Sequence, residues 1–455
     1  MESPSNPGRF IEQLYSDNLH EYYGILARHF IIGENYEKGA KHCRLACKKA
    51  EKAGSLDDAI AYLNKQIVCI EKLSQTEDVE KNLIDARTTL GLYYAQMGQV
   101  INAKATVDQI VDMATRLNYK KRVSQIYNIL GLYKEVVEED FPKSFEFYDK
   151  SIKIGEELND LLSLVLANHW MAEGLSLNSE YDKALHYWKK ALEIDIKTNS
   201  LWGISAIKAW IACFVYHNQG KIILGYETSD EALRIADESG DIYSKAHAYT
   251  AYGCSYYYKG YLEKAEEYLL LGGDFSDRIN YIPFGVLAHF ILGDIYLHME
   301  KYKISQKHYK KAISFLQIVR GWPSFVNLLN MAIVRAKVLN NEKNIKLNEL
   351  FKYHDDTKTK LYKSWELYYL SDILLNIDNH YKTETEDWIK KAIQSYKQYS
   401  MVWFLARVYV LYADLFKRKG DQKKAKEHLG KAIEIFQECG ADGWAKNYEE
   451  ELSAL

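Results

Sequence analysis

Apolar and polar residues alternate along most of the chain with the spacing of amphipathic helices. Apolar residues recur at positions i, i+3, i+4 and i+7 through stretches of roughly 16–18 residues, and short polar turns separate these stretches. Two such stretches joined by a tight turn form one antiparallel helical hairpin. The pattern therefore predicts a chain that is almost entirely helical.

The helical pattern itself repeats about every 40 residues. A small residue marks each repeat, and these residues are Gly91, Gly131, Ala172, Cys213, Gly253 and Gly293, spaced 40, 41, 41, 40 and 40 positions apart. A tyrosine follows three positions after Gly253 and Gly293, and an aromatic ring recurs in the second stretch of the hairpin. A small residue lets two helices approach closely, and the ring fills the space beside the contact. The repeat is therefore a packing pattern, and it indicates a solenoid of stacked hairpins.

The repeat resembles the tetratricopeptide repeat family. The residues that carry this resemblance are Leu292, Gly293, Tyr296, Ser305, Tyr309 and Ala312; then Gly253, Tyr256 and Ala265; and Ala172, Ala184, Trp188 and Ala191. The proline that often closes the family's second helix is missing, and each repeat is longer than the usual ~34 residues. Longer repeats of this kind are similar to the regulatory regions of bacterial cyclases and signalling ATPases. The resemblance implies an all-α, right-handed superhelix of roughly eleven hairpins, with a concave groove lined by the first helices.

The regularity of the repeat divides the chain into three parts. We expect entry helices over residues 1–78, regular repeats over 79–340, and less regular repeats with a polar capping helix over 341–455. The Trp322-Pro323 pair predicts a helix start, because proline is tolerated in the first turn. Residues 341–360 are shorter and more polar than any other unit, so this segment is predicted to be the weakest.

Composition and charge narrow the class of protein. The chain of 455 residues has only 5 prolines and 25 glycines, and its 62 acidic and 59 basic residues leave a formal charge of −3. This balance gives no electrostatic footprint for nucleic acid or for an anionic membrane. The six cysteines form no regular framework, and no signal-peptide core or apolar run of about 20 residues occurs. These features predict a cytoplasmic protein that binds neither nucleic acid nor membrane.

Three segments carry a weak suggestion of chemistry. "LGGDF" at 271–275 resembles the hairpin motif of diguanylate cyclases, but its place in a predicted helix argues against that role. His42, Cys43 and Cys47 lie close together without a second ligand pair for zinc, so buried thiols explain them better. No nucleophile motif, phosphate loop or dinucleotide fingerprint is present. We therefore predict no catalytic, cofactor or metal site.

The predicted groove supplies the candidate binding residues. In the tetratricopeptide pattern, positions six and three before the small residue, and one and four after it, face the concave surface. The candidates selected this way are Asn128, His169, Glu173, Trp210, Phe214, His217, His247, Tyr257, Phe290 and Asp294. Rings and polar groups that converge in a concavity suit peptide capture. The alternative is that some of these side chains pack within the superhelix. The candidates do not match a chaperone-tail carboxylate clamp, because only Asn128 fits its requirement for basic and amide groups.

Three functions follow from this reading. The first is a non-enzymatic scaffold that binds a protein or peptide, as the regulatory or docking region of a bacterial signalling protein attached to an upstream domain. The second is a peptide-sensing regulator whose superhelix changes shape when a ligand binds. The third is an enzyme with an unrecognised site that uses His169 or Glu173. Whether Met1 is the native start stays open at this stage.

Overall fold

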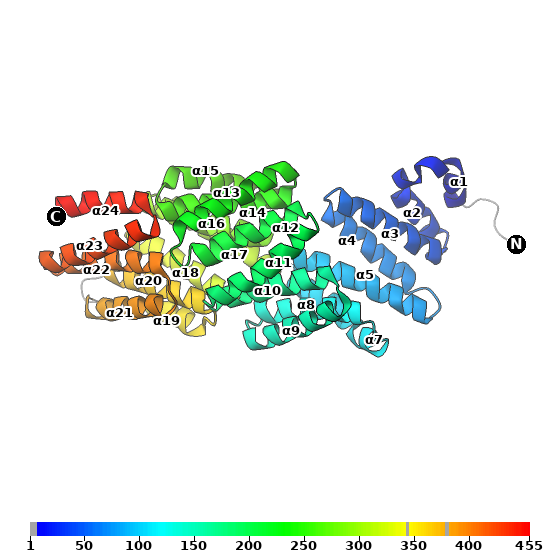
Figure 1. The fold of residues 1–455 in the computed structure, drawn as a ribbon, viewed down its shortest axis with the longest axis horizontal. Coiled ribbons are helices and arrows are strands. Elements are labelled where there is room, and N and C mark those ends of the chain that lie inside the picture. Colours follow the sequence, from blue (N-terminus) through cyan, green and yellow to red (C-terminus); the bar gives the residue numbers. More distant parts are fainter. Residues whose placement is uncertain (1–6, 343–344, 378–381) are drawn as a thin grey trace. The chain divides into compact units, whose positions relative to one another are not determined.

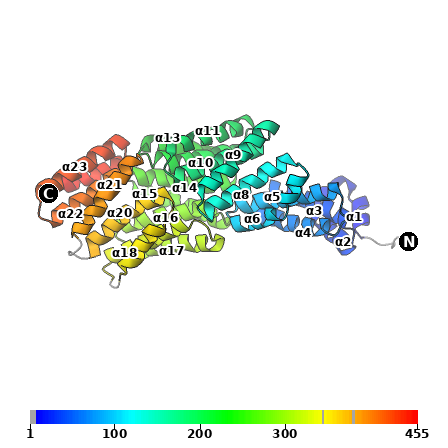
Figure 2. The ribbon, with the colours of Figure 1, turned by 90° about the horizontal axis from the view of Figure 1, so that it is seen from below.

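The chain folds as an array of α-helices that follow one another in packed pairs (Figure 1, Figure 2). The structure is a computed structural model, and it describes residues 7–342, 345–377 and 382–455. Within these ranges there is no β-strand. None of the described helices combines the length and the apolar character that a membrane crossing needs. The predicted all-α class is thus confirmed.

The helices have the following bounds. The first part of the chain contains α1 Pro7–Leu14, the 3-10 helix η1 Ser16–Glu21, α2 Tyr23–Ile32, α3 Tyr36–Lys52, α4 Leu56–Ile70, α5 Glu77–Gln96, α6 Val100–Asp108, α7 Val111–Arg116, α8 Lys120–Val136 and α9 Phe141–Leu158. The middle contains α10 Leu161–Leu177, α11 Tyr181–Lys197, α12 Leu201–Ile211, the π-helix η2 Ala212–Tyr216, α13 Ile222–Ser239, α14 Ile242–Lys259, α15 Leu262–Arg278, α16 Ile282–His298 and α17 Tyr302–Val319. The last part contains α18 Pro323–Leu339, α19 Leu347–Asp356, α20 Lys360–Ile377, α21 Lys382–Gln398, α22 Val402–Arg418, α23 Gln422–Cys439 and α24 Asp442–Ala454.

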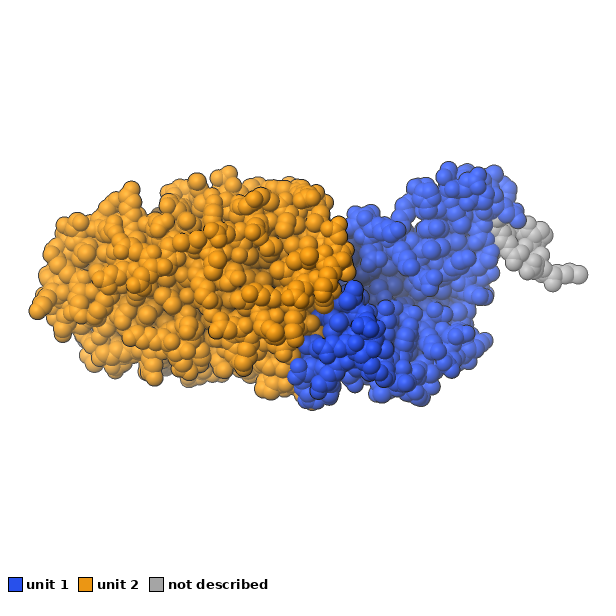
Figure 3. Space-filling view, in the orientation of Figure 1, with its two compact units in different colours: residues 1–133, 146–164 blue, residues 134–145, 165–455 orange. Residues whose placement is uncertain are grey.

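Two compact units divide the chain, and Figure 3 colours them separately. Unit 1 contains residues 1–133 and 146–164, and unit 2 contains residues 134–145 and 165–455. The division predicted from the sequence, at 78 and 340, followed the regularity of the repeat and stays a prediction.

Left-handed backbone residues mark the turns between helices at nearly constant intervals. They are Asn118, Glu139, Asn159, Ser179, Asn199, Gly220, Gly240, Gly260, Asn280, Glu300 and Arg320. Most are glycine or asparagine, which adopt this conformation at low cost after a helix end. Two turns of this kind make one hairpin, which accounts for the 40-residue repeat in the sequence.

In two of the hairpins a ring of the second helix packs against a small residue of the first, whereas Leu269 takes this place against Gly253. In unit 2, a Cβ placed on Gly293 would lie 2.3 Å from a ring carbon of Tyr309, which is itself fully buried. In unit 1, the same relation joins Gly131 to Tyr148, at 2.5 Å. The pairing of a small residue with a ring is the packing role predicted from the sequence. The "LGGDF" segment at 271–275 lies inside α15, as expected.

In unit 1 the cysteine-containing helix α3 is a packing element. Cys43 and Cys47 are buried, and burial raises their thiol pKa to about 12 and about 11. The His42 ring is bound through Nε2 to the Glu12 carboxylate at 2.9 Å. Within the described ranges, no group of three or more potential metal ligands occurs.

In unit 2 the C-terminal helices contact a hairpin far back in the chain. The Trp403 indole N–H donates to the Tyr258 carbonyl at 3.0 Å, and the Trp444 indole N–H donates to the Tyr257 carbonyl at 2.8 Å. Gly260 has a φ of 92°, and a Cβ at this position would lie 2.3 Å from the Trp444 backbone nitrogen. A simple solenoid has contacts only between neighbouring repeats. Unit 2 is therefore closed upon itself at α14, α22 and α24.

A second closure joins the turn before α9 to the start of α18, also within unit 2. The Trp322 backbone N–H donates to the Val136 carbonyl at 2.7 Å. The Glu139 carboxylate accepts from the Ser324 backbone N–H at 3.0 Å and from the Ser324 hydroxyl at 2.6 Å. These contacts cap α18, which begins at Pro323 as the sequence predicts. The described residues between 341 and 359 include one short helix, α19, and nothing described there tests the predicted weakness.

Candidate ligand-binding site

Two cavities lie among the described residues of unit 2, and the first is mainly apolar. This apolar pocket encloses about 510 Å³ of space not filled by atoms, part of which opens to solvent. Its lining residues are Glu173, Leu177, Trp210, Phe214, Pro283, Val286, Leu287, Leu316, Trp322, Phe325, Tyr362 and Trp365. Most of these side chains come from α10, α12, α16, α18 and α20, which are first helices of their hairpins. The pocket is therefore lined mainly by first helices, the helices that the sequence pattern predicts to form the groove.

Glu173 is the one carboxyl group among the residues that line the apolar pocket. Its side chain is buried, and no other described residue pairs with it or donates a hydrogen bond to its carboxyl group. Burial disfavours the charged form and raises the pKa of Glu173 to about 8. At neutral pH the group is therefore largely protonated and can act as a hydrogen-bond donor.

Trp210 and Phe214 form an aromatic wall of the apolar pocket. Their rings stack with a centroid distance of 4.7 Å and an interplanar angle of 29°. Phe214 lies in the π-helix η2, where the backbone departs from the α-helical hydrogen-bond pattern. Single turns of π-helix inside α-helices are frequent at functional sites, because they reposition side chains along the helix. Phe214 is only partly buried, so its ring is available to a ligand.

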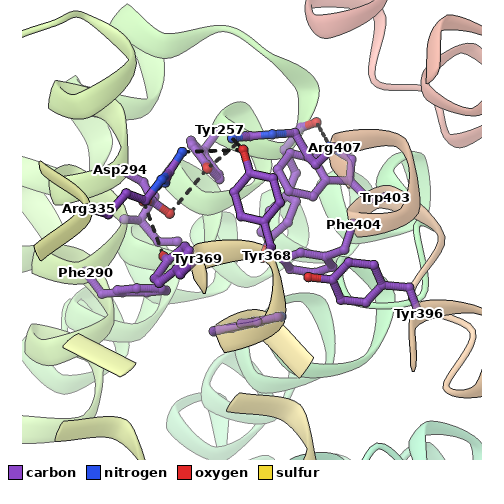
Figure 4. A pocket seen from close by; sticks show the side chains of 13 residues that line it. Tyr257, Phe290, Asp294, Arg335, Tyr368, Tyr369, Tyr396, Trp403, Phe404 and Arg407 are labelled. Atoms are coloured by element: carbon purple, nitrogen blue, oxygen red, sulfur yellow. Dashed lines mark hydrogen bonds and ion pairs between the residues drawn. The ribbon is translucent and has the colours of Figure 1, made fainter. Parts of the chain in front are cut away.

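The second cavity is the arginine pocket, shown in Figure 4. It encloses about 420 Å³ of space not filled by atoms, part of which opens to solvent. Its lining residues are Tyr257, Tyr258, Phe290, Ile291, Asp294, Arg335, Trp365, Tyr368, Tyr369, Tyr396, Trp403, Phe404 and Arg407. They come chiefly from α14, α16, α18, α20 and α22, the first helices of five successive hairpins. Rings thus surround two arginines and one aspartate.

Arg335 is a fully paired buried cation. Its Nε donates to the Asp372 carboxylate at 2.5 Å, and a terminal nitrogen lies 3.6 Å from the Asp294 carboxylate. Asp294 also accepts hydrogen bonds from the hydroxyls of Tyr309 at 2.7 Å and of Tyr369 at 3.4 Å. A buried ion pair is tolerated when further hydrogen bonds satisfy both partners. This half of the arginine pocket is therefore internally neutralised.

Arg407 lies in the same pocket without a carboxylate partner. Its terminal nitrogens donate to the Tyr368 hydroxyl at 3.1 Å and to the Tyr257 hydroxyl at 3.5 Å. Among the described residues, no acidic group forms an ion pair with it, and its buried Nε has no hydrogen-bond acceptor. The indoles of Trp403 and Trp444 lie 5.3 and 5.1 Å from the guanidinium carbon. Among the described residues, its direct partners are aromatic faces and neutral hydroxyls, and the second cation of the pocket, Arg335, repels it.

One residue joins the two pockets. Trp365 lines both of them, and its ring stacks on Phe290 with centroids 5.7 Å apart. Phe290 in turn meets Phe325 of the apolar pocket edge to face, at 5.4 Å. The two pockets therefore share an aromatic floor formed by Trp365 and Phe290.

The structure brings six of the ten candidate residues to these pockets. They are Glu173, Trp210 and Phe214 in the apolar pocket and Tyr257, Phe290 and Asp294 in the arginine pocket. Their binding role stays a prediction.

Two of the other candidates occupy helix interfaces. The His247 ring is hydrogen-bonded to the Tyr281 hydroxyl at 2.9 Å, and the His217 ring is hydrogen-bonded to the Ser255 hydroxyl at 2.9 Å. Burial lowers the pKa of His247 to about 4 and that of His217 to about 3. Both rings are therefore neutral at physiological pH, as packing groups are.

His169 and Asn128 also make contacts between helices. The Trp188 indole N–H donates to the His169 ring at 3.2 Å, which ties α10 to α11. In unit 1, the Asn128 amide donates to the Ser163 carbonyl at 3.1 Å. Neither residue is among those that line the two pockets. The two cavities therefore give no support to a binding role for His169 or Asn128.

Sequence reasoning missed the residues contributed by the later hairpins. Ser371 and Ala413 are small, buried residues in α20 and α22. The groove pattern selects the residue six positions before each small residue, and here it selects Trp365 and Arg407. Applied to the hairpins after Gly293, the pattern would therefore have found both. Arg335 would have escaped the rule, because the residue before it is Val334, which is not small.

Comparisons with known proteins agree with this architecture. A family model described as tetratricopeptide repeat, TPR_8, matches residues 287–315 and 406–439, which fall in the α16–α17 and α22–α23 hairpins. No curated protein matches the sequence significantly. Among solved structures, a Rap protein complexed with competence and sporulation factor shares 15% identity at a TM-score of 0.51, over 89% of this chain and 99% of its own.

Two further structures are similar at lower scores. The apo form of RapI shares 12% identity at a TM-score of 0.43, over 88% of this chain and 97% of its own. A signal-transduction ATPase with a tetratricopeptide repeat sensor from Pyrococcus horikoshii shares 15% identity at a TM-score of 0.38, over 91% and 74%. The family-model matches and the packed hairpins identify the chain as one that contains tetratricopeptide repeats in an all-helical array.

Proposed function

We propose that unit 2 is a non-enzymatic scaffold that binds a peptide or a protein segment in its two connected pockets. The observation that carries this proposal is the shared aromatic floor at Trp365, which links a mainly apolar cavity to one that contains charge. Rings supply contact area for a ligand, and a few polar groups fix its register. The ligand is an extended segment with at least two apolar or aromatic side chains.

The first experiment selects ligands and tests one residue of the apolar pocket. Random octapeptides are incubated with the full chain, and the retained peptides are identified by mass spectrometry and measured by isothermal titration. Phe214→Ala removes a partly exposed ring of the pocket and is expected to weaken binding at least about tenfold. Phe275→Ala is the matched control, because Phe275 is also partly exposed but packs against Tyr249 and lines neither pocket. Equal binding by both variants would contradict the placement of the ligand.

The closure contacts favour a second, related function, that of a peptide-sensing regulator. Trp322 lines the apolar pocket and also donates to the Val136 carbonyl in the closure before α9. Tyr257 lines the arginine pocket and also accepts from the Trp444 indole at its carbonyl. A ligand that moves either residue changes a contact between distant hairpins, which is how binding energy alters the shape of an array. Small-angle scattering of the full chain with a selected peptide tests this function, and an unchanged radius of gyration would exclude it.

The biological setting we propose is the one implied by the longer repeats. The chain acts as a regulatory or docking region of a bacterial signalling protein, in the cytoplasm, and receives its partner in unit 2. An immunoblot of the native protein tests the attachment to a signalling domain. A band well above 52.9 kDa is expected, and a band at that mass would indicate a free-standing adaptor.

A further inference from the structure

The two arginines of the arginine pocket differ in a way that packing does not explain. Both are 4% exposed. Arg335 has Asp372 and Asp294 as partners, whereas Arg407 has no carboxylate partner among the described residues. Burying a charge without a counter-charge is costly, so such groups are ordinarily paired. Arg407 therefore lacks an ion pair with a carboxylate, the interaction that would stabilise a buried guanidinium most.

The neighbours of Arg407 compensate only in part. The rings of Tyr368, Trp403 and Trp444 lie 5.1–5.4 Å from the guanidinium carbon, which gives cation–π attraction. Among the described residues, its hydrogen-bond acceptors are the neutral hydroxyls of Tyr257 and Tyr368, and Nε has none. An anion in the pocket would supply the counter-charge that the guanidinium lacks among the described residues. The space for that anion is the arginine pocket itself, which Arg407 lines.

The other groups of the pocket limit the kind of anion. Arg335 and Asp294 neutralise each other in the same cavity, so among the described residues Arg407 leaves one unbalanced positive charge there, and a singly charged group matches it better than a doubly charged phosphate. A carboxylate carries a single charge, and its planar shape matches two N–H groups of a guanidinium. The aromatic lining, with Trp365, Phe404 and Trp403, requires that the carboxylate be carried on an apolar or aromatic body.

We propose that Arg407 is the binding site for a carboxylate of the peptide ligand, either its C-terminal carboxylate or an aspartate or glutamate side chain next to an aromatic residue. The inference rests on the proposed function, since it names the group by which the peptide is recognised. Bound there, the carboxylate supplies the missing counter-charge, and the adjoining aromatic residue packs over the floor formed by Trp365 and Phe290. The Glu173 end of the apolar pocket then receives the rest of the segment.

The test uses two pools of acetylated random octapeptides, one with free C-terminal carboxylates and one with C-terminal amides. Each pool is selected on the wild-type chain, on Arg407→Gln and on Arg407→Lys, and circular dichroism checks that each variant is folded. Wild-type protein is expected to enrich either free C-termini or acidic side chains beside aromatic residues. For the best peptide, replacing that carboxylate by its amide is expected to weaken binding at least tenfold in wild type and less than threefold in Arg407→Gln. Arg407→Lys should recover part of the preference.

The outcomes distinguish a failure of the Arg407 assignment from a failure of peptide binding as such. Enrichment of free C-termini over amides identifies the terminal carboxylate as the source, and enrichment of acidic residues in both pools identifies a side chain. Peptides that bind wild type with no carboxylate preference would overturn the role of Arg407 and leave peptide binding intact. A preference that persists unchanged in Arg407→Gln would likewise place the carboxylate elsewhere. If neither pool yields a bound peptide, the proposed function falls and this assignment falls with it.

Discussion

The Ser324 hydroxyl donates to the Glu139 carboxylate at 2.6 Å, although the two residues are 185 positions apart in the chain. Glu139 also has a left-handed backbone, with φ at 51°, and its carboxylate accepts from the Thr359 hydroxyl at 3.4 Å. One buried side chain thus closes unit 2 between the turn before α9, the start of α18 and the start of α20. Contacts of this range are absent from a solenoid in which each repeat meets only its neighbours.

Substitution of Glu139 should loosen this closure. Glu139→Gln keeps the shape but replaces an acceptor oxygen by a donor NH₂, so buried donors of Ser324 and Thr359 lose a partner. We expect a loss of about 1–3 kcal/mol in the free energy of unfolding. Glu138→Gln is the control, since Glu138 forms only a partly exposed ion pair with Lys134 and should cost at most about 1 kcal/mol. Urea denaturation measures both, and equal effects would contradict the closing role of Glu139.

The turn at Gly260 offers a second test of the closed arrangement. Gly260→Ala introduces a Cβ into the space of the Trp444 backbone nitrogen, whereas Gly240→Ala has a similar positive φ and nothing within 4 Å of the new Cβ. We expect Gly240→Ala to cost roughly 1 kcal/mol for backbone strain. Gly260→Ala should cost about 1–3 kcal/mol more, because the contact is also overpacked. It should also release α24, with a change in tryptophan fluorescence. A difference within error would mean that α24 is not held at Gly260.

The two arginines should respond differently to the same substitution. Arg335→Met leaves the Asp372 carboxylate buried without its cation, and such a loss costs about 3–5 kcal/mol. Arg407→Met leaves no unpaired carboxylate behind, so its effect on stability should be at least about 2 kcal/mol smaller. Thermal or urea unfolding of the ligand-free proteins provides the comparison. Equal destabilisation would show that Arg407 has a structural counter-charge after all.

Glu173 should make the stability of the protein depend on pH. Its pKa is raised to about 8 in the folded chain, against about 4.3 for an unperturbed glutamate. The folded state therefore keeps a proton that the unfolded state releases, and stability falls as the pH rises from about 4.5 towards 8. The slope from this group is at most about 1.4 kcal/mol per pH unit. Glu173→Gln should remove this component, so the difference between variant and wild type should grow between pH 5 and 8. A pH-independent difference would contradict the raised pKa.

Much of this architecture could be predicted from the sequence. The spacing of small residues gave the hairpins and the first-helix positions, because a solenoid repeats the same local packing. Tyr257, Phe290 and Asp294 were found in this way, and all three line the arginine pocket. The same rule also selected His217 and His247, which lie in helix interfaces. An offset from an anchor identifies the inner face of a helix, but it cannot tell a cavity from a contact.

The rest could not be read from the repeat, because it depends on contacts between distant hairpins. Nothing local to Tyr258 indicates that its carbonyl accepts from the Trp403 indole, 145 residues later. The π-helix η2, which places Phe214 in the apolar pocket, is also a departure from the regular pattern. The missing partner of Arg407 is a property of the whole closed interior. A sequence pattern that all repeats share cannot predict a feature that occurs in one repeat alone.

The central claim is that a peptide occupies the interior of unit 2, and photo-crosslinking tests it most directly. A selected octapeptide with one aromatic residue replaced by p-benzoylphenylalanine is irradiated with the wild-type chain, and the attached residues are mapped by mass spectrometry. We predict attachment to lining residues of the two pockets, such as Trp365, Phe290 or Phe214, and its loss when unlabelled peptide competes. Attachment confined to the second helices α13 or α15, which contribute no residue to either pocket, would contradict the account.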